Sequence, residues 1–234
     1  MISIIIPVYN GEKTLLATLK SIENQTWRDF EVIIENDGST DNTQKVFENF
    51  SKNNKLDNCY YFINNNKNQG APVARNLGWQ KAQGEFLFFC DADAVLKTDA
   101  LEKMQQSLKD NPSSAYAYSS FYWGKKLFKL WPFDPNRLKK MPYIHTMALI
   151  RTETFPKNGW DESIKKLQDW DLWLTMLENG HTGVFIEEAL FKVSPSGNIS
   201  SWLPAFAYKA LPFLPQVKKY KQAMAIIKAK HNLS

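Results

Sequence analysis

The segment Asp91-Ala92-Asp93 carries the clearest chemical signal in the sequence. It follows the apolar run at residues 86–89, so two carboxylates come directly after an expected buried strand. Residues two apart on extended backbone point to the same side. Paired hard oxygen ligands suit Mg²⁺ or Mn²⁺, and these metals commonly hold substrate phosphates as well. The alternative is a solvated turn, but the apolar strand before the pair favours a metal and phosphate site.

Two further polar clusters could serve the same site. The turn at residues 36–39 begins with Asn36 and Asp37, whose side-chain oxygens could accept a nucleobase N–H. Its alternative interpretation is the N-cap of the following helix. Asp169 and Asp171 begin another expected helix, where the helix dipole alone favours carboxylates. The functional alternative is a general base that the start of this helix directs at the substrate.

The first half of the chain predicts the elements that would bring these clusters together. Apolar runs at residues 2–8, 30–34, 59–63 and 85–90 predict strands. Apolar residues at helical spacing follow each strand, at residues 15–22, 46–50, 71–82 and 98–108. This alternation predicts an α/β fold with a mostly parallel central sheet flanked by helices. Right-handed crossovers then place the carboxyl ends of the strands, where ligands bind, at one edge.

The second half of the chain has a less regular pattern. Residues 122–142 are basic and aromatic without a clear period, which predicts an insertion or flap. A mixed strand at 144–150, a helix at 169–178 and a short strand at 182–186 complete the predicted body. We therefore expect one domain over residues 1–200, followed by a basic, aromatic and helical C-terminal extension over residues 201–234.

Composition and missing motifs exclude several other classes. The 234 residues are 44% hydrophobic and 23% charged, which is an ordinary globular balance. No apolar run approaches the ~20 residues of a transmembrane helix, and the first residues do not resemble a signal peptide. Two cysteines are too few for a disulfide framework, which favours a cytoplasmic location. Dinucleotide, P-loop, nucleophile-elbow and zinc-spacing motifs are missing, and the three histidines are isolated in the sequence.

Taken together, the motifs resemble those of the inverting glycosyltransferases of family 2, which have a GT-A (Rossmann-like) fold. The resemblance spans about residues 2–200 and consists of five motifs in order. These are Ile4-Ile5-Ile6-Pro7-Val8-Tyr9-Asn10, Asn36-Asp37-Gly38-Ser39-Thr40-Asp41, Asn68-Gln69-Gly70 with Ala74-Arg75-Asn76, Gly84-Glu85-Phe86 running into Asp91-Ala92-Asp93, and Asp169-Trp170-Asp171-Leu172-Trp173-Leu174.

The resemblance implies a role for each matching position. The implied nucleotide-sugar-binding residues are Pro7, Val8, Tyr9, Asn36, Asp37, Arg75, Asp91, Ala92 and Asp93. Asp91 and Asp93 would form the DxD motif that binds Mn²⁺ or Mg²⁺, with Asp93 the more direct ligand. Asp169 would occupy the position of the catalytic base. Trp170 and Asp171 would lie on the acceptor side.

The chain departs from the family pattern at three places. Asn36 stands where the family often has an aspartate, and its amide oxygen could still accept a uracil N–H. Gln168 replaces a common glutamate, which removes a charge beside Asp169 and should lower the proton affinity of that base. The segment from Ser194 to Gly197 lacks the histidine that many members carry after the last strand and that would supply a third protein ligand for the metal.

The implied reaction is transfer of a sugar, with inversion, from a nucleotide diphospho-sugar to a hydroxyl of a glycan or lipid-linked acceptor. A hexosyltransferase that uses a UDP-sugar in cell-surface polysaccharide synthesis is the favoured form. One alternative is a sugar-nucleotide nucleotidyltransferase, although the chain lacks a Gly-rich, Arg-containing loop after its first strand. Another is a non-catalytic nucleotide-sugar-binding protein, although the DxD motif and Asp169 are both present.

The C-terminal extension suggests a membrane partner. The net charge is +5, and seven lysines but no acidic residue follow Glu188. Val217, Tyr220, Met224 and Ile227 recur at helical spacing, and aromatic residues precede them from Trp202 onward. A basic amphipathic helix of this kind can lie on an anionic membrane surface. The alternative is that the apolar stripe packs on the catalytic domain. We expect no nucleic-acid partner, since no nucleic-acid-binding module is recognisable.

Overall fold

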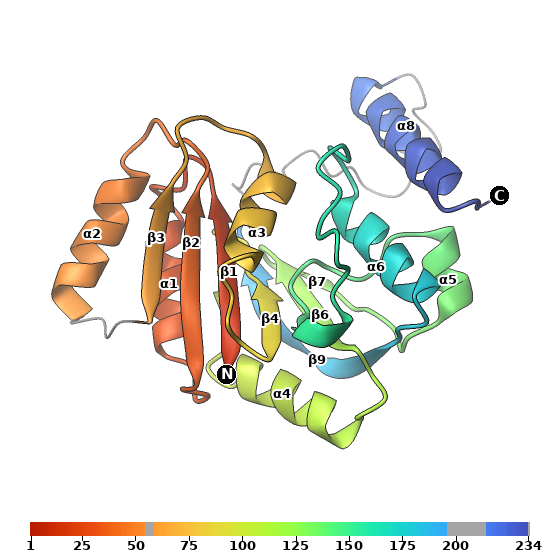
Figure 1. Cartoon of the computed structure of the whole chain (residues 1–234), viewed down its shortest axis with the longest axis horizontal. Helices are drawn as coiled ribbons and strands as arrows, with labels where there is room; N and C mark the ends of the chain where they lie inside the picture. Colours follow the sequence, from red (N-terminus) through yellow and green to blue (C-terminus); the bar gives the residue numbers. More distant parts are fainter. Residues whose placement is uncertain (55–58, 196–213, 234) are drawn as a thin grey trace.

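The computed structural model describes residues 1–54, 59–195 and 214–233 and has an α/β architecture (Figure 1). The first half of the sheet consists of β1 (Ile2–Val8), β2 (Phe30–Asn36), β3 (Tyr60–Asn64) and β4 (Phe86–Phe89), all paired in parallel in the order β3-β2-β1-β4. The central strand β1 is buried on both faces because helices cover both sides of the sheet.

Helices alternate with these strands as the sequence pattern predicts. They are α1 (Leu15–Glu23), α2 (Thr43–Asn54), α3 (Ala71–Trp79) and α4 (Ala100–Asp110). In Figure 1, α3 lies in front of the sheet and α1 behind it. Gly78 allows α3 to approach β1 closely, because a Cβ atom there would lie 2.5 Å from Ile5 Cγ2.

The second half of the sheet is more extensive than the sequence pattern predicts. It contains β5 (Ala94–Leu96), β6 (Tyr116–Trp123), β7 (Lys126–Phe128), β8 (Leu149–Arg151) and β9 (Gly183–Val193). The order continues from β4 through β8, β6, β9 and β5, with β7 paired to β6. β8 is antiparallel to β4 and to β6, whereas β6 and β9 are parallel. The remaining elements are α5 (Pro135–Lys140), the 3₁₀ turn Thr152–Thr154, α6 (Gln168–Glu178) and α8 (Pro215–Lys230).

Several expectations about this half need correction. β6 was not predicted, because the sequence of residues 116–121 shows no alternation of apolar and polar residues. In the structure these residues are all buried. The predicted flap at 122–142 contains the end of β6, then β7 and α5. The strand expected at 144–150 is reduced to β8, and the short strand expected at 182–186 extends to Val193. Both cysteines, Cys59 and Cys90, are free.

The C-terminal extension contains a helix that packs on the domain. In α8, Val217 and Ile227 are completely buried. The expected apolar stripe therefore contacts protein, which favours the packing alternative for these residues. The expected boundary at residue 200 and the aromatic residues Trp202, Phe206 and Phe213 lie outside the described residues. In the described part of the chain, no helix is long and apolar enough to cross a membrane.

Candidate active site

The strand register brings the predicted site residues to one edge of the sheet. Val8 pairs with Asn36, and Asn36 pairs with Asn64, so β1, β2 and β3 end side by side. On the other side of β1, Phe89 of β4 pairs with Ile5. The segments that follow β1, β2 and β4 therefore emerge at the same edge, as the sequence analysis predicted.

Asp37 ties the loop after β2 to the segment before α3. Its two carboxylate oxygens accept the backbone N–H groups of Gln69 and Gly70 at 2.9 and 2.8 Å, and its own N–H donates to the carbonyl of Val8. Gly38 has a φ of +68°, and a Cβ atom there would lie 2.6 Å from the carbonyl carbon of Lys67. Glycine at this position therefore lets the two loops touch.

Asn36 is buried and held in one orientation. Its Nδ2 donates to Asn64 Oδ1 at 2.7 Å, so its Oδ1 faces the other way and accepts the N–H of Ser39 at a long 3.3 Å. The nearby loop after β1 is fixed by Asn10, which has a φ of +53° and accepts the N–H of Thr40 at 2.9 Å. Within this loop, Tyr9 is 39% exposed. The amide oxygen of Asn36 keeps a second lone pair for another donor.

Asp91, Ala92 and Asp93 lie in a tight turn between β4 and β5, where the N–H of Ala94 donates to the carbonyl of Asp91 at 3.1 Å. The expectation of extended backbone was wrong, because β4 ends at Phe89 and the chain turns into β5. Partial burial and, in the same direction, the charge of Asp91 together raise the pKa of Asp93 to about 7. A half-buried carboxyl beside another carboxylate is a position where a cation would be stabilising.

Asp169 lies in the first turn of α6. Leu167, just before the helix, has a φ of +58°, and Asp169 Oδ1 accepts the N–H of Trp170 at 2.9 Å. Burial raises the pKa of Asp169, and the charge of Asp91 adds to this, while His145 and Arg75 oppose it. The replacement of glutamate by Gln168 was expected to lower the proton affinity of Asp169. That effect of Gln168 stays a prediction, and the net shift from the ordinary carboxyl value is upward because desolvation is the largest effect.

Arg75 links the two carboxylate sites. Its Nη1 donates to Gln168 Oε1 at 2.9 Å, and its Nη2 lies 3.4 Å from Asp91 Oδ1. The guanidinium also stacks over Trp160, with Cζ 4.7 Å from the ring centroid. Arg75 is 6% exposed, so it acts as a buried bridge between α3, the turn after β4 and the start of α6. Gln168 takes the place at which a glutamate would form an ion pair with Arg75.

His145 is the site residue that the sequence analysis missed. Its Nε2 lies 3.7 Å from Asp91 Oδ2, and Phe121 and Phe191 flank its ring at centroid distances of 4.7 and 5.3 Å. Burial lowers its pKa, although Asp91 and Asp169 act in the opposite direction. The N–H of Met147 donates to its Nδ1, so the neutral ring carries its proton on Nε2, toward Asp91. Since His145 is isolated in the sequence, no spacing signal could have found it.

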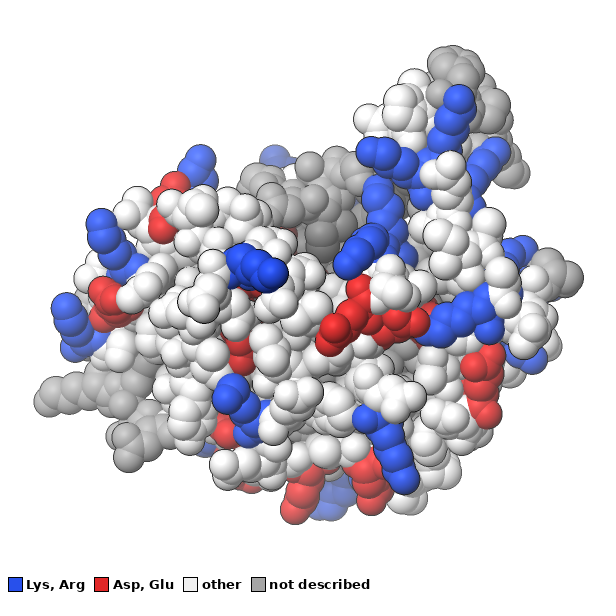
Figure 2. Space-filling view, turned by 45° about the horizontal axis from the view of Figure 1, so that its top comes forward, with Lys and Arg blue, Asp and Glu red and all other residues white. Residues whose placement is uncertain are grey.

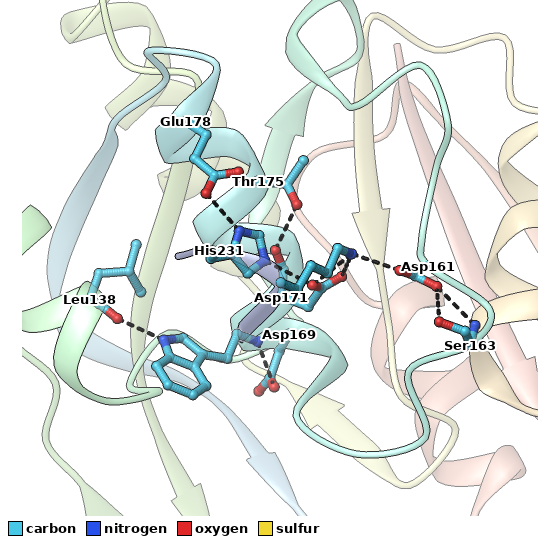
Figure 3. Close-up of polar contacts among 10 residues, drawn as sticks. Leu138, Asp161, Ser163, Asp169, Asp171, Thr175, Glu178 and His231 are labelled. Carbon is cyan, nitrogen blue, oxygen red and sulfur yellow. Dashed lines mark hydrogen bonds and ion pairs between the residues drawn. The ribbon is translucent and has the colours of Figure 1, made fainter. Parts of the chain in front are cut away.

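Trp170 and Asp171 do not face a surface that an acceptor could contact. Trp170 is completely buried, and its indole N–H donates to the carbonyl of Leu138 at 2.6 Å. Asp171 is 4% exposed and is paired with Lys230, the last residue of α8, and with His231 just after it (Figure 3). The acceptor-side expectation for these two residues needs correction, because both side chains are bound inside the protein.

The fold and this cluster can be compared with known proteins. The family model described as glycosyl transferase family 2 matches residues 3–161, which is more than half of the chain. The chain belongs to glycosyltransferase family 2. It is a glycosyltransferase, and the expectations of family and enzyme class are confirmed.

Relatives of this glycosyltransferase occur in bacteria and in an archaeon. An uncharacterized glycosyltransferase of Methanocaldococcus jannaschii is 28% identical over 204 residues, covering 82% of this chain and 70% of the relative. A putative teichuronic acid biosynthesis glycosyltransferase of Bacillus subtilis is 27% identical, with 93% and 91% covered. The GalNAc(5)-diNAcBac-PP-undecaprenol beta-1,3-glucosyltransferase of Campylobacter jejuni is 36% identical over 119 residues, but the match covers only 51% of this chain and 37% of the relative.

Solved structures confirm the GT-A fold of the glycosyltransferase. S. aureus TarS in complex with UDP-GlcNAc is similar with a TM-score of 0.75 and 20% identity, covering 98% of this chain and 66% of that one. A mannosyltransferase from Pyrobaculum calidifontis, in complex with GDP-Man and Mn²⁺, has a TM-score of 0.70 and 17% identity, with 98% and 68% covered. At these identities the similarity establishes the fold alone.

Proposed function

We propose that the enzyme transfers a sugar from a UDP-sugar to a hydroxyl of a glycan or lipid-linked acceptor, with inversion, in cell-surface polysaccharide synthesis. One observation carries this proposal. The carboxylates of Asp91 and Asp169 share Arg75 and His145 as neighbours, so the proposed donor site and the proposed general base lie next to each other. Release of UDP from a panel of UDP-sugars tests the proposal.

The residues of the turn fit Mn²⁺ or Mg²⁺ as cofactor. The pKa of the Asp93 carboxyl is raised because the group is partly buried and lies near the negative charge of Asp91. A divalent cation would supply the positive charge that stabilises the ionised carboxylate. Among the described residues no group of three or more His, Cys, Asp or Glu could hold a metal. Two carboxylates are sufficient if donor phosphates complete the shell, as is common for Mg²⁺. When bound, the cation would offset the negative charge that develops on the leaving diphosphate.

Asp169 supplies the proton acceptor in the proposed mechanism. The acceptor hydroxyl attacks the anomeric carbon, the bond to the diphosphate breaks, and Asp169 takes the hydroxyl proton. A carboxylate with a raised pKa is a stronger base than an ordinary one, which suits proton removal near neutral pH. Because the reaction is a single displacement, it inverts the anomeric centre and needs no covalent enzyme intermediate.

We propose uracil as the preferred donor base, because Asn36 can accept its N3–H through Oδ1. The contact with Asn64 fixes that oxygen in place. UDP should therefore bind more tightly than GDP in calorimetry with Mn²⁺, and Asn36→Leu, which removes the acceptor, should weaken UDP binding. Tighter binding of GDP by the unchanged protein would contradict the assignment.

A groove beside α8 supports the proposal of a lipid-linked acceptor. Its lining combines four apolar residues, three lysines and two uncharged polar residues: Ile164, Ala223, Ile226, Ile227, Lys165, Lys166, Lys219, Ser163 and Gln222. Lysines beside an apolar surface suit a lipid diphosphate, because the lysines can bind the diphosphate and the apolar surface can contact the hydrocarbon chain. The Campylobacter relative, by its name, acts on a PP-undecaprenol-linked glycan.

We also propose that the enzyme acts as a peripheral protein on the cytoplasmic face of an anionic membrane. Lys and Arg side chains gather over the part of the surface near α8 (Figure 2), and Lys218, Lys219 and Lys221 are exposed there. Each lysine near an anionic leaflet contributes about 1 kcal/mol of attraction. Flotation should show binding to anionic but not neutral vesicles, weakened by salt and by changing these three lysines to Gln. Failure of the unchanged protein to bind anionic vesicles at low salt would refute this.

A further inference from the structure

A cluster of ion pairs and hydrogen bonds binds the end of α8 to α6, and the proposed reaction does not use it (Figure 3). Lys230 Nζ donates to Asp171 at 2.9 Å and to Asp161 Oδ2 at 2.7 Å. His231 Nε2 lies 2.9 Å from Asp171 Oδ1, and His231 Nδ1 lies 2.8 Å from Glu178 Oε1. We call these residues the α8 clamp: Asp161, Asp171, Glu178, Lys230 and His231.

The clamp is almost closed to water at its centre. The side chains of Asp171 and His231 are 5% and 2% exposed. Since both ring nitrogens of His231 face carboxylates, the imidazolium, which donates from both, is the form that fits. Burial by itself would lower the pKa of His231, but the hydrogen bonds with Asp171 and Glu178 raise it above its ordinary value. The clamp thus sets two cations, Lys230 and His231, against three carboxylates.

The clamp holds the same helical turn that carries Asp169. Asp169 and Asp171 both lie in the first turn of α6. Figure 3 shows the carboxylate of Asp169 pointing away from the clamp while Asp171 points into it. The other attachments of this turn are Gln168, which accepts from Arg75, and Trp170, which donates to Leu138. Without the α8 contacts, Asp171, on the side of the turn opposite Asp169, would lose its partners Lys230 and His231. Its carboxylate would then be a buried charge without compensation.

We infer that Lys230 and His231 are positioning residues for the proposed base Asp169, acting through Asp171, so that the end of α8 is part of what makes the glycosyltransferase active. This inference rests on the proposed role of Asp169. A displacement of about 1 Å in a catalytic group can cost as much as 10²-fold in rate. Donor binding, which is assigned to other elements, should not depend on the clamp.

The test compares variants of the clamp in UDP-release kinetics with a UDP-sugar and Mn²⁺. Lys230→Met and His231→Gln should each lower kcat by roughly 10- to 100-fold while the donor KM and the calorimetric affinity for UDP stay nearly unchanged. Lys230→Arg, which keeps the charge and can still bridge two carboxylates, should restore most of kcat. Lys52→Met, which removes an exposed lysine from the last turn of α2, is the matched control and should behave as wild type.

The pH profile separates positioning from mere structural support. The native pKa of His231 is raised, so the charged clamp is complete below the unfolded pKa of about 6.5 and is lost as pH rises through the native value. Wild-type kcat should therefore fall on the alkaline side, and His231→Gln should lack that fall. The charged groups that face His231 are Asp171 and Glu178 of α6 and Lys230 beside it, with Asp161 bound through Lys230.

The results distinguish failure of this inference from failure of the proposed function. If Lys230→Met and His231→Gln both have the kcat of the wild-type enzyme, the positioning role is overturned and the proposed function is left intact. Equal losses of kcat and UDP affinity would also overturn it, because they indicate general destabilisation. If Lys230→Met does not fold, Asp161→Asn removes only one contact of Lys230 and should still give a selective, smaller loss of kcat. No UDP release by wild type would instead reject the proposed function.

Discussion

Replacing Asp169 with asparagine is expected to lower the rate of sugar transfer by roughly 10²-fold or more, while donor affinity stays nearly unchanged. The amide has almost the shape of the carboxylate and can still accept the N–H of Trp170, but it cannot take a proton from the acceptor. Steady-state UDP release measures the rate, and calorimetry with UDP and Mn²⁺ measures donor binding. Only the rate should change.

A variant with the wild-type rate would show that another group is the base. Asp171 is the nearest carboxylate on the same helix, but its oxygens are held by Lys230 and His231. The pH dependence gives a second check. Because the pKa of Asp169 is raised, its basic form should appear at a higher pH than for an ordinary carboxylate, and the acid-side fall in transfer rate should shift accordingly. This acid-side dependence should be missing in Asp169→Asn.

Asp93→Ala is expected to abolish transfer and its dependence on divalent cations. The pKa of Asp93 is raised to about 7, so its ionised form would be stabilised by a bound cation. Wild-type UDP release should stop in EDTA and recover when Mn²⁺ is added in excess. Asp110→Ala, at the exposed end of α4, is the matched control and should keep wild-type activity. Full wild-type turnover in EDTA would contradict a role for the metal.

The part of the site at the edge of the sheet was predictable from the sequence. Apolar runs that end in Asn36-Asp37 and in Asp91-Ala92-Asp93 predict both the parallel strands and the edge at which the polar groups meet. These features are local, since each cluster follows its strand in the chain. The same reasoning located Asp169 at the first turn of α6, because helix periodicity begins there.

The contacts between distant segments were not predictable. His145 reaches Asp91 only because β8 lies antiparallel between β4 and β6, and no pattern in the sequence gives that order. His231 reaches Asp171 across 60 residues of chain. The raised pKa of Asp169 was not predictable for the same reason, because the sequence names its neighbour Gln168 but not the burial that dominates the shift. Tertiary packing decides all three.

The most direct test of the central claim is the anomeric configuration of the first sugar released. Proton NMR can follow cleavage of a UDP-α-sugar with Mn²⁺ and water as the acceptor, during the first minutes before mutarotation mixes the anomers. A single displacement assisted by Asp169 predicts that the β anomer appears first. Initial appearance of the α anomer would contradict the proposed inverting mechanism and the role of Asp169 as its base.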